Sequence, residues 1–305
     1  FPYTTLFRSR LSPRGQHGEQ GGRAVTDTEL VQKIKREISD ENREPVLRFG
    51  LEPGEPGLTE SKVGGTPYLP RDMAWPQGPD GLPMTLLAQV DCAALAGLPD
   101  FPHSGLLQFF IALNDVFGLD FDDMTNPDGF RVLYHETADL SVTAEEVQAK
   151  RPAIPADVEP AYMTPLGGVC RIRFGAPEIQ GMTEGDYRYE ALFCAKWNAC
   201  RPDAPVSHIW DLSGCWDDGE AAYEDGYAEG AMHQMGGYPY FTQTDPRCDG
   251  RHPELDTVLF QLDSDMREGR DEVLWGDCGV GNFFISRQAL RRRDFSQVGY
   301  NWDCC

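Results

Sequence analysis

The segments LLAQVD at residues 86–91 and VLFQLD at residues 258–263 decide the fold class of this chain. A second pair follows them: residues 107–111 read LQFFI, and residues 281–285 read GNFFI. Each run is short, rich in bulky aliphatic or aromatic residues, and bounded by Gly, Pro or Asp, which is typical of buried strands. The segments therefore predict a mainly β fold, with α+β character from a few short helices.

The same segments form a repeat. The first pair is offset by 172 residues (86 to 258) and the second by 174 (107 to 281), in the same order. The first pair also shares a Gln, an apolar residue and an Asp at its end, which apolar strands in general do not require. Self-similarity at nearly one offset predicts an internal duplication. We therefore expect two similar β-rich halves packed together, at about residues 45–165 and 166–305.

Helical patterns are few. Thr26 and Glu29 fit a capping box, and apolar residues at positions 30, 31, 34 and 38 share one face, which predicts a helix from about residue 26. Further short helices are expected within residues 141–150 and 185–210. The Pro- and Gly-rich stretch at residues 53–83 excludes long regular elements. Strands are expected at residues 84–90, 106–113, 256–262 and 282–287.

The charge of the chain excludes several classes of partner. There are 27 Lys and Arg against 49 Asp and Glu, a formal net charge of -22. Such a field repels phosphate backbones and anionic lipid surfaces, so neither nucleic acid nor a membrane is an expected partner. No run of 18 apolar residues is present to span a bilayer. A protein with a basic surface is the expected partner; the plainer alternative is that the charge serves only solubility.

Cysteine usage indicates a reducing compartment. The nine cysteines are odd in number, include no CxxC pair and end in adjacent Cys304 and Cys305. We therefore expect a cytoplasmic protein whose thiols pack mostly as small apolar groups, without a cofactor. One set of residues offers zinc-type ligands, although its spacing matches no compact zinc motif: Cys194, Cys200, His208 and Cys215.

Several segments together resemble a known family. They are SKVGGTPYLP (61–70), Trp75-Pro76, LLAQVD (86–91), HQMGGYP (233–239), LFQLDSD (259–265), LWGDCGVGNFFI (274–285) and DFSQVGYNWDCC (294–305). In this order they resemble the YwqG-like proteins, a family of unknown function. The resemblance implies a mainly β, roll-like fold with an internal duplication, usually bacterial and cytoplasmic, and no established activity. Some members are thought to lie beside secreted-toxin genes, which implies an immunity or accessory binding role. The chain departs from the family pattern at Gly236 and Cys278, which leaves the fold prediction intact.

The first residues look foreign to the domain. FPYTTLFRS at residues 1–9 back-translates to a string that matches a common short-read sequencing adapter read in frame. We therefore expect residues 1–9 to be an assembly artefact. Because the residues that follow are polar and Gly-rich, the whole segment 1–24 is expected to be disordered. Residues 25–305 are expected to form a single YwqG-like domain.

Four side chains form the strongest candidate for chemistry: His233, Asp263, Asp265 and Asp277. Asp263 and Asp265 alternate at the end of a predicted strand, so both carboxylates face one side. Asp277 follows a Trp-Gly break, where a backbone can approach a ligand closely. Carboxylates beside a histidine could hold a divalent ion, or divide general acid and base duties. The structural alternative is that each Asp accepts backbone N–H bonds in a turn.

Other signals are weaker. Residues 121–129 (FDDMTNPDG) look like a calcium loop but place Met124 and His135 at ligand positions, which excludes an EF-hand. Cys278 is a candidate nucleophile with His233 as its partner, against the alternative of a packed thiol. Four aromatic residues could form a binding face, or could belong to the core and its turns: Trp75, Tyr238, Trp275 and Trp302.

Three functions remain open on the sequence alone. The leading hypothesis is a non-enzymatic binding protein, such as an immunity or accessory factor, facing a basic protein partner. The runner-up is a metal-assisted hydrolase or another enzyme that uses the His/Asp cluster. The third is a small-molecule or peptide sensor at the junction of the two halves, because pockets favour such seams.

Overall fold

The computed structural model describes residues 26–158, 163–212 and 232–305. The expectations for residues 1–24 and for Cys215 lie outside the described residues. Helices and 3-10 turns occur at α1 (Asp27–Glu41), η1 (Cys92–Leu95), α2 (Ala144–Gln148), α3 (Tyr189–Cys200), η3 (Ile209–Leu212), η4 (Cys248–Gly250) and α5 (Arg287–Arg291).

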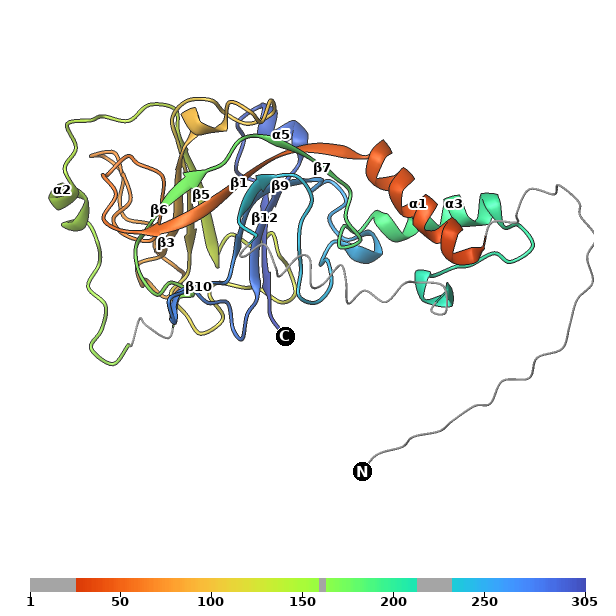
Figure 1. Ribbon diagram of the computed structural model, residues 1–305. Coiled ribbons are helices and arrows are strands. Elements are labelled where there is room, and N and C mark those ends of the chain that lie inside the picture. The colour runs from red at the N-terminus through yellow and green to blue at the C-terminus, as the bar shows by residue number, and fades with distance from the viewer. Residues whose placement is uncertain (1–25, 159–162, 213–231) are drawn as a thin grey trace, which may run out of the picture.

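One large antiparallel sheet organises the molecule (Figure 1). It runs in the order β13-β12-β9-β8-β1-β6-β2-β3-β4-β5 and curls into a nearly closed, barrel-like form, with β7 pairing with β1 off this path. A separate hairpin is made by β10 (Asp265–Arg267) and β11 (Arg270–Val273). The main-sheet strands are β1 (Arg43–Pro53), β2 (Lys62–Val63), β3 (Thr85–Asp91), β4 (Leu106–Ile111), β5 (Phe130–His135), β6 (Cys170–Phe174), β7 (Glu178–Gly181), β8 (Gln234–Gly236), β9 (Thr257–Asp263), β12 (Val280–Ile285) and β13 (Val298–Asp303).

The mainly β prediction is confirmed, and so are its decisive strands. The four segments that opened the sequence argument form β3, β9, β4 and β12, and β4 and β12 are buried along their whole length. Inside the curled sheet, the Phe109 ring stacks on Phe260 with centroids 4.5 Å apart, and it packs at a tilt against Phe283 with centroids 4.9 Å apart. Both faces of these strands pack against protein, so their sequences read as continuous apolar runs rather than alternating ones.

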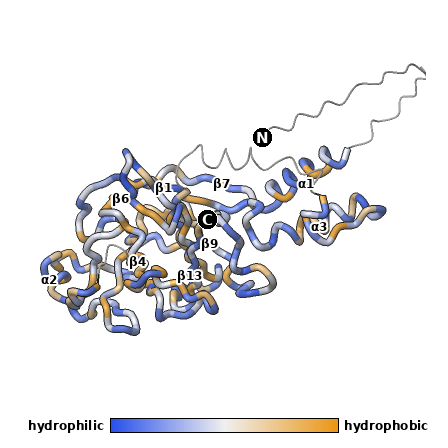
Figure 2. Tube along the Cα trace, turned by 90° about the horizontal axis from the view of Figure 1, so that it is seen from below, coloured by the Kyte–Doolittle hydropathy of each residue, from blue (hydrophilic) through white to orange (hydrophobic). Residues whose placement is uncertain are grey.

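The helix expected near residue 26 is also confirmed. The Thr26 side chain accepts a hydrogen bond from the Glu29 N–H, and the Glu29 carboxylate accepts one from the Thr26 N–H. The buried face of α1 packs on α3, and both helices lie together at one end, beyond the sheet (Figures 1 and 2). The short helices α2 and α3 fall within the two segments where helices were expected. Among the described residues, no helix is long and apolar enough to cross a bilayer.

Strand β1 was not predicted. It joins two groups of strands in the main sheet: one is formed by β7, β8, β9, β12 and β13, and the other by β2, β3, β4, β5 and β6. Its first part pairs with β7 and β8, and its last part, from Phe49 to Pro53, pairs with β6. The apolar pattern of this segment is interrupted by Pro45, Gly50 and Pro53, so periodicity in the sequence does not predict the strand. The strand is fixed by its partners on both sides rather than by its own sequence.

A loop joins the two edges of the sheet. In the described part of the chain, β5 and β13 are not hydrogen-bonded to each other. The loop at residues 112–129 lies beside β13 instead. Tyr300 N–H donates to the Met124 carbonyl, and the Tyr300 hydroxyl donates to the Phe117 carbonyl, both at 2.8 Å. Trp302 Nε1 donates to the Val116 carbonyl at 2.8 Å. The exposed N–H and C=O groups of an edge strand are thereby covered.

Two four-stranded meanders, β2-β3-β4-β5 and β8-β9-β12-β13, follow one another with the same order of pairing. A buried glutamine occupies the same place in each. Gln89 Oε1 accepts from Tyr68 N–H at 2.9 Å, and Gln261 Oε1 accepts from Tyr240 N–H at 2.8 Å. Matched contacts of this kind agree with the repeat seen in the sequence, and the internal duplication itself stays a prediction.

Replacing either buried glutamine with leucine should destabilise the fold. In Gln89→Leu and Gln261→Leu, the N–H groups of Tyr68 and Tyr240 lose their acceptors inside the protein. We expect each variant to lose about 2–4 kcal/mol in the free energy of unfolding, measured in urea. The control is Gln297→Leu at an exposed position, which should change this free energy by less than about 0.5 kcal/mol. Equal effects at all three positions would contradict the role of the buried amides.

Candidate functional site

His233 lies buried directly before β8, where its ring stacks on Phe49 with centroids 5.3 Å apart. Its Nδ1 accepts a hydrogen bond from the Asp263 N–H at 3.0 Å, which places the proton of the neutral ring on Nε2. Nε2 lies 3.4 Å from Oδ2 of Asp265. The ring therefore bridges β8, the end of β9 and the start of β10.

The Asp263 carboxylate is occupied by backbone donors. Oδ2 accepts from the Met232 N–H and Oδ1 from the Ser264 N–H, both at 2.8 Å. Burial raises the pKa of Asp263, and these hydrogen bonds and the neighbouring His233 oppose that rise. The pKa of Asp265 is lowered, first by its hydrogen bond with His233, and burial opposes this change. The surroundings thus shift the pKa values of Asp263 and Asp265 in opposite directions, although the two residues lie only two positions apart in the sequence.

The structure brings together three of the four predicted cluster residues. Asp277 is exposed in the turn after Trp275, and within the described ranges no hydrogen bond or ion pair joins it to His233, Asp263 or Asp265. No group of three or more His, Cys, Asp or Glu side chains in the described parts could hold a metal ion. The contacts seen here are those of a turn held by backbone donors. Cys278 is exposed in the same turn as Asp277, whereas His233 is buried.

The four candidate aromatic residues lie in three different clusters. Trp75 is buried with the β3–β4 face, and its Nε1 donates to the Met84 carbonyl at 2.9 Å. Tyr238 is buried against α1 and α3. Trp275 is fully buried inside the curled sheet, and the half-buried Trp302 ring lies 5.8 Å from it. These residues pack as core, and they do not form one exposed face.

The three described residues of the zinc-type set differ in burial. Cys194 is buried on α3, while Cys200 at the end of that helix is exposed. His208 is exposed and lies 3.5 Å from Glu190. The fourth residue of this set, Cys215, lies outside the described residues, as stated above.

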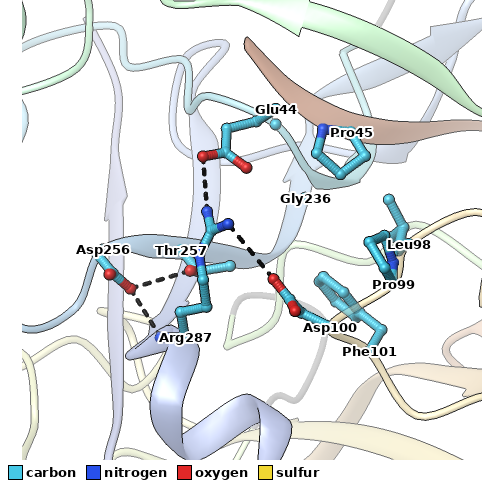
Figure 3. Close-up of a pocket in the computed structure, with 11 residues that line it drawn as sticks. Glu44, Pro45, Leu98, Pro99, Asp100, Phe101, Gly236, Asp256, Thr257 and Arg287 are labelled. Carbon is cyan, nitrogen blue, oxygen red and sulfur yellow. Dashed lines mark hydrogen bonds and ion pairs between the residues drawn. The ribbon is translucent and has the colours of Figure 1, made fainter. Parts of the chain in front are cut away.

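A pocket lies where the two groups of strands meet (Figure 3). Arg287, the first residue of α5, reaches between Glu44 at 2.7 Å and Asp100 at 3.4 Å. Asp256 Oδ1 accepts from the Arg287 N–H at 2.8 Å and from the Thr257 hydroxyl at 3.0 Å. Burial disfavours the charged form of Arg287 and by itself would lower the pKa of this residue. The hydrogen bond to Glu44 and the attraction of the nearby carboxylates have the larger effect, so the pKa of Arg287 is raised.

Sequence reasoning missed the residues of this pocket. Glu44, Asp100 and Arg287 are distant along the chain, and none belongs to a motif. The sequence suggested a binding site at the junction of the two halves, but it did not indicate which residues form that site. Only the pairing of β1 with β8, and the position of α5 after β12, place these three side chains together.

The His233–Asp265 pair should make stability depend on pH in the acid range. A carboxyl group with a lowered pKa stabilises the fold above its unfolded pKa of about 3.9, and this stabilisation is lost as pH falls through the folded value. We expect Asp265→Asn to lose about 1 kcal/mol in the free energy of unfolding at pH 7, with the difference from wild type shrinking below about pH 4. The control is Asp271→Asn at an exposed position. A difference that does not change with pH would contradict the pairing.

Comparison with known proteins agrees with the resemblance seen in the sequence. Residues 61–304 match the family model described as "Domain of unknown function (DUF1963)", which covers most of the chain. The YwqG-like description is consistent with this family. No curated protein matches the sequence. The matched range includes both meanders, the pocket-lining loop before β4, and α5. The chain therefore belongs to the DUF1963 family.

Proposed function

We propose that this protein is a non-enzymatic binding protein that recognises a basic surface on a protein partner, as an immunity or accessory factor does. The observation that supports the proposal most directly is the loop at residues 112–129. This loop contains five aspartates and no Lys or Arg, so no basic side chain within the loop balances its negative charge. The aspartates are Asp115, Asp120, Asp122, Asp123 and Asp128.

Hydrogen bonds within this acidic loop stabilise the charge of two of its aspartates, Asp120 and Asp123. The side chain of Asn126, followed by the N–H groups of Asp122 and Asp123, lowers the pKa of Asp120. The hydroxyl of Thr125, followed by its N–H, lowers the pKa of Asp123. Both carboxylates are therefore ionised at neutral pH and keep their negative charge available to a partner.

The acidic loop is also held in one place, which favours recognition over loose attraction. Met124 is buried, and the loop's carbonyls receive the bonds from Tyr300 and Trp302 described above. Phe121 lies among the aspartates with 76% of its surface exposed. An aromatic ring beside fixed carboxylates suits an arginine or lysine side chain, which can meet the ring face and a carboxylate together.

A cytoplasmic location is part of the same proposal. The eight described cysteines are all free thiols. Burial raises the pKa of both Cys92 and Cys170 to about 12, so these two thiols are poor nucleophiles. Free thiols in such number suit a reducing compartment.

Removing charge from the acidic loop should weaken binding of a basic probe. Asp115→Asn/Asp122→Asn/Asp128→Asn changes three exposed loop carboxylates. We expect at least a roughly tenfold loss of affinity for an arginine-rich peptide, measured by fluorescence anisotropy at about 0.15 M salt, where distant charges are screened.

The matched control is Glu55→Gln/Asp72→Asn/Asp157→Asn, which removes the same charge from exposed positions elsewhere. It should weaken binding only slightly. Equal losses in both triple variants would mean that net charge, and not the loop, attracts the peptide. No binding of the peptide by the wild-type protein would overturn the proposed class of partner.

A further inference from the structure

Two cysteines lie together at one end of β12 and β13, near the end of the chain marked C in Figure 1. Cys278 is exposed in the turn between β11 and β12, and Cys304 directly follows β13 and is partly buried. In the ladder of these two strands, Val280 pairs with Asp303. The chain just before β12 and the chain just after β13 are therefore neighbours.

The Cys304 side chain lies directly on the turn that carries Cys278. A Cβ atom placed on Gly276 would stand 2.5 Å from Cys304 Sγ, and one placed on Gly279 would stand 2.8 Å from Cys304 Cβ. Both distances are well below an ordinary van der Waals contact, so the turn has room for this side chain because glycine occupies both positions. Cys278 lies between these two glycines in the sequence. The two cysteines thus belong to one small site.

Hydrogen bonds hold both members of the pair in position. The Cys278 N–H donates to the Trp275 carbonyl at 3.2 Å, which closes the turn. The Cys304 carbonyl accepts from Gln243 Nε2 at 2.5 Å, and the Asp303 carboxylate accepts from the Gln243 N–H at 2.8 Å. Two thiols held close together in one chain react with each other far faster than thiols that must meet by diffusion.

Exposure distinguishes this pair from the buried thiols. Burial raises the pKa of both Cys92 and Cys170 to about 12, so these two thiols rarely form the reactive thiolate. Cys278 is open to solvent, and an oxidant in solution can reach it. Cys304 is less exposed but lies on the same turn. The arrangement suits an attack by Cys278 on the oxidant, followed by an attack by Cys304 on Cys278.

We propose that Cys278 and Cys304 form a reversible disulfide when the protein meets a low-molecular-weight disulfide such as oxidised glutathione. The Cys278 thiolate attacks one sulfur of the oxidant, forms a mixed disulfide and releases one glutathione. The Cys304 thiolate then attacks the Cys278 sulfur and releases the second glutathione. The two protein thiols give up two protons and two electrons, which convert one oxidised glutathione into two reduced molecules. An excess of reduced thiol reverses both steps.

The disulfide joins β12 and β13 at the end where their pairing stops. It closes a loop of the chain from residue 278 to residue 304, which restricts the unfolded chain. Strand β13 also carries Tyr300 and Trp302, whose donors hold the acidic loop. Oxidation therefore fixes the strand that supports this loop. The inference goes beyond the proposed recognition of a basic partner, and it does not depend on it.

Peptide mapping under non-reducing conditions tests for the bond. The reduced full-length protein is incubated with oxidised glutathione, its remaining thiols are alkylated, and the protein is cleaved with trypsin. We expect residues 271–287, which contain Cys278, linked to residues 294–305, which contain Cys304. Dithiothreitol should separate the two peptides. Absence of the linked peptide would overturn the proposal, and so would a yield that falls when the protein is diluted, because that bond would join two molecules.

Three variants assign the bond to its two sulfur atoms. Cys278→Ser and Cys304→Ser should each abolish the linked peptide, because each removes one of the sulfur atoms. The matched control is Cys305→Ser, which removes the exposed thiol next to Cys304 and should still give the linked peptide. A linked peptide that persists in Cys304→Ser, or one that is lost in Cys305→Ser, would contradict the assignment.

Thermal unfolding provides a second readout on the same samples. Oxidation should raise the Tm of the wild-type protein by at least about 4 °C, because the disulfide restricts the unfolded chain. The Tm of Cys304→Ser should be the same before and after incubation with oxidised glutathione. An equal rise in this variant would place the effect at another thiol and would overturn the proposal.

Discussion

The hydrogen bonds between the loop at residues 112–129 and β13 hold together two sheet edges that would otherwise be open. A long, curled antiparallel sheet needs each edge paired or covered, because unpaired backbone groups attract other strands. Here β5 and β13 do not pair, and the carbonyls of Val116, Phe117 and Met124 meet donors of β13 instead. The loop is therefore part of the architecture. Its position follows from the geometry of the sheet.

That constraint also shapes the surface on which the proposed function rests. A loop that closes a sheet cannot move freely, so its aspartates and Phe121 are presented in one arrangement. The carboxylates of Asp120 and Asp123 accept hydrogen bonds from donors within the loop, which stabilise their negative charge. An interaction surface prepared in this way loses little conformational entropy on binding.

The junction between the two groups of strands follows a different principle. There, charged side chains are paired with one another: Arg287 links Glu44 with Asp100, and Arg291 contacts the same aspartate. Partly exposed ion pairs contribute modestly to stability, so their main effect is to fix the loop before β4 against α5.

The sequence by itself determined the elements whose signal is local. The capping box of α1 and the apolar runs of four strands depend on residues that are close in the sequence; these strands are β3, β4, β9 and β12. The excess of acidic residues follows from the composition alone. Alternation predicted that Asp263 and Asp265 face one side of the strand. Their contacts with His233 depend on the pairing of β8 with β9, which no local pattern records.

Tertiary structure alone decided the rest. It made a strand of β1, whose interrupted pattern is overcome by partners on both sides. It buried Trp75, Tyr238 and Trp275 in separate clusters, because an aromatic residue is directed by the face it occupies and not by its type. It also brought Glu44, Asp100 and Arg287 to one pocket. Contacts between residues so distant in sequence depend on how the sheet curls, and no local pattern records that curvature.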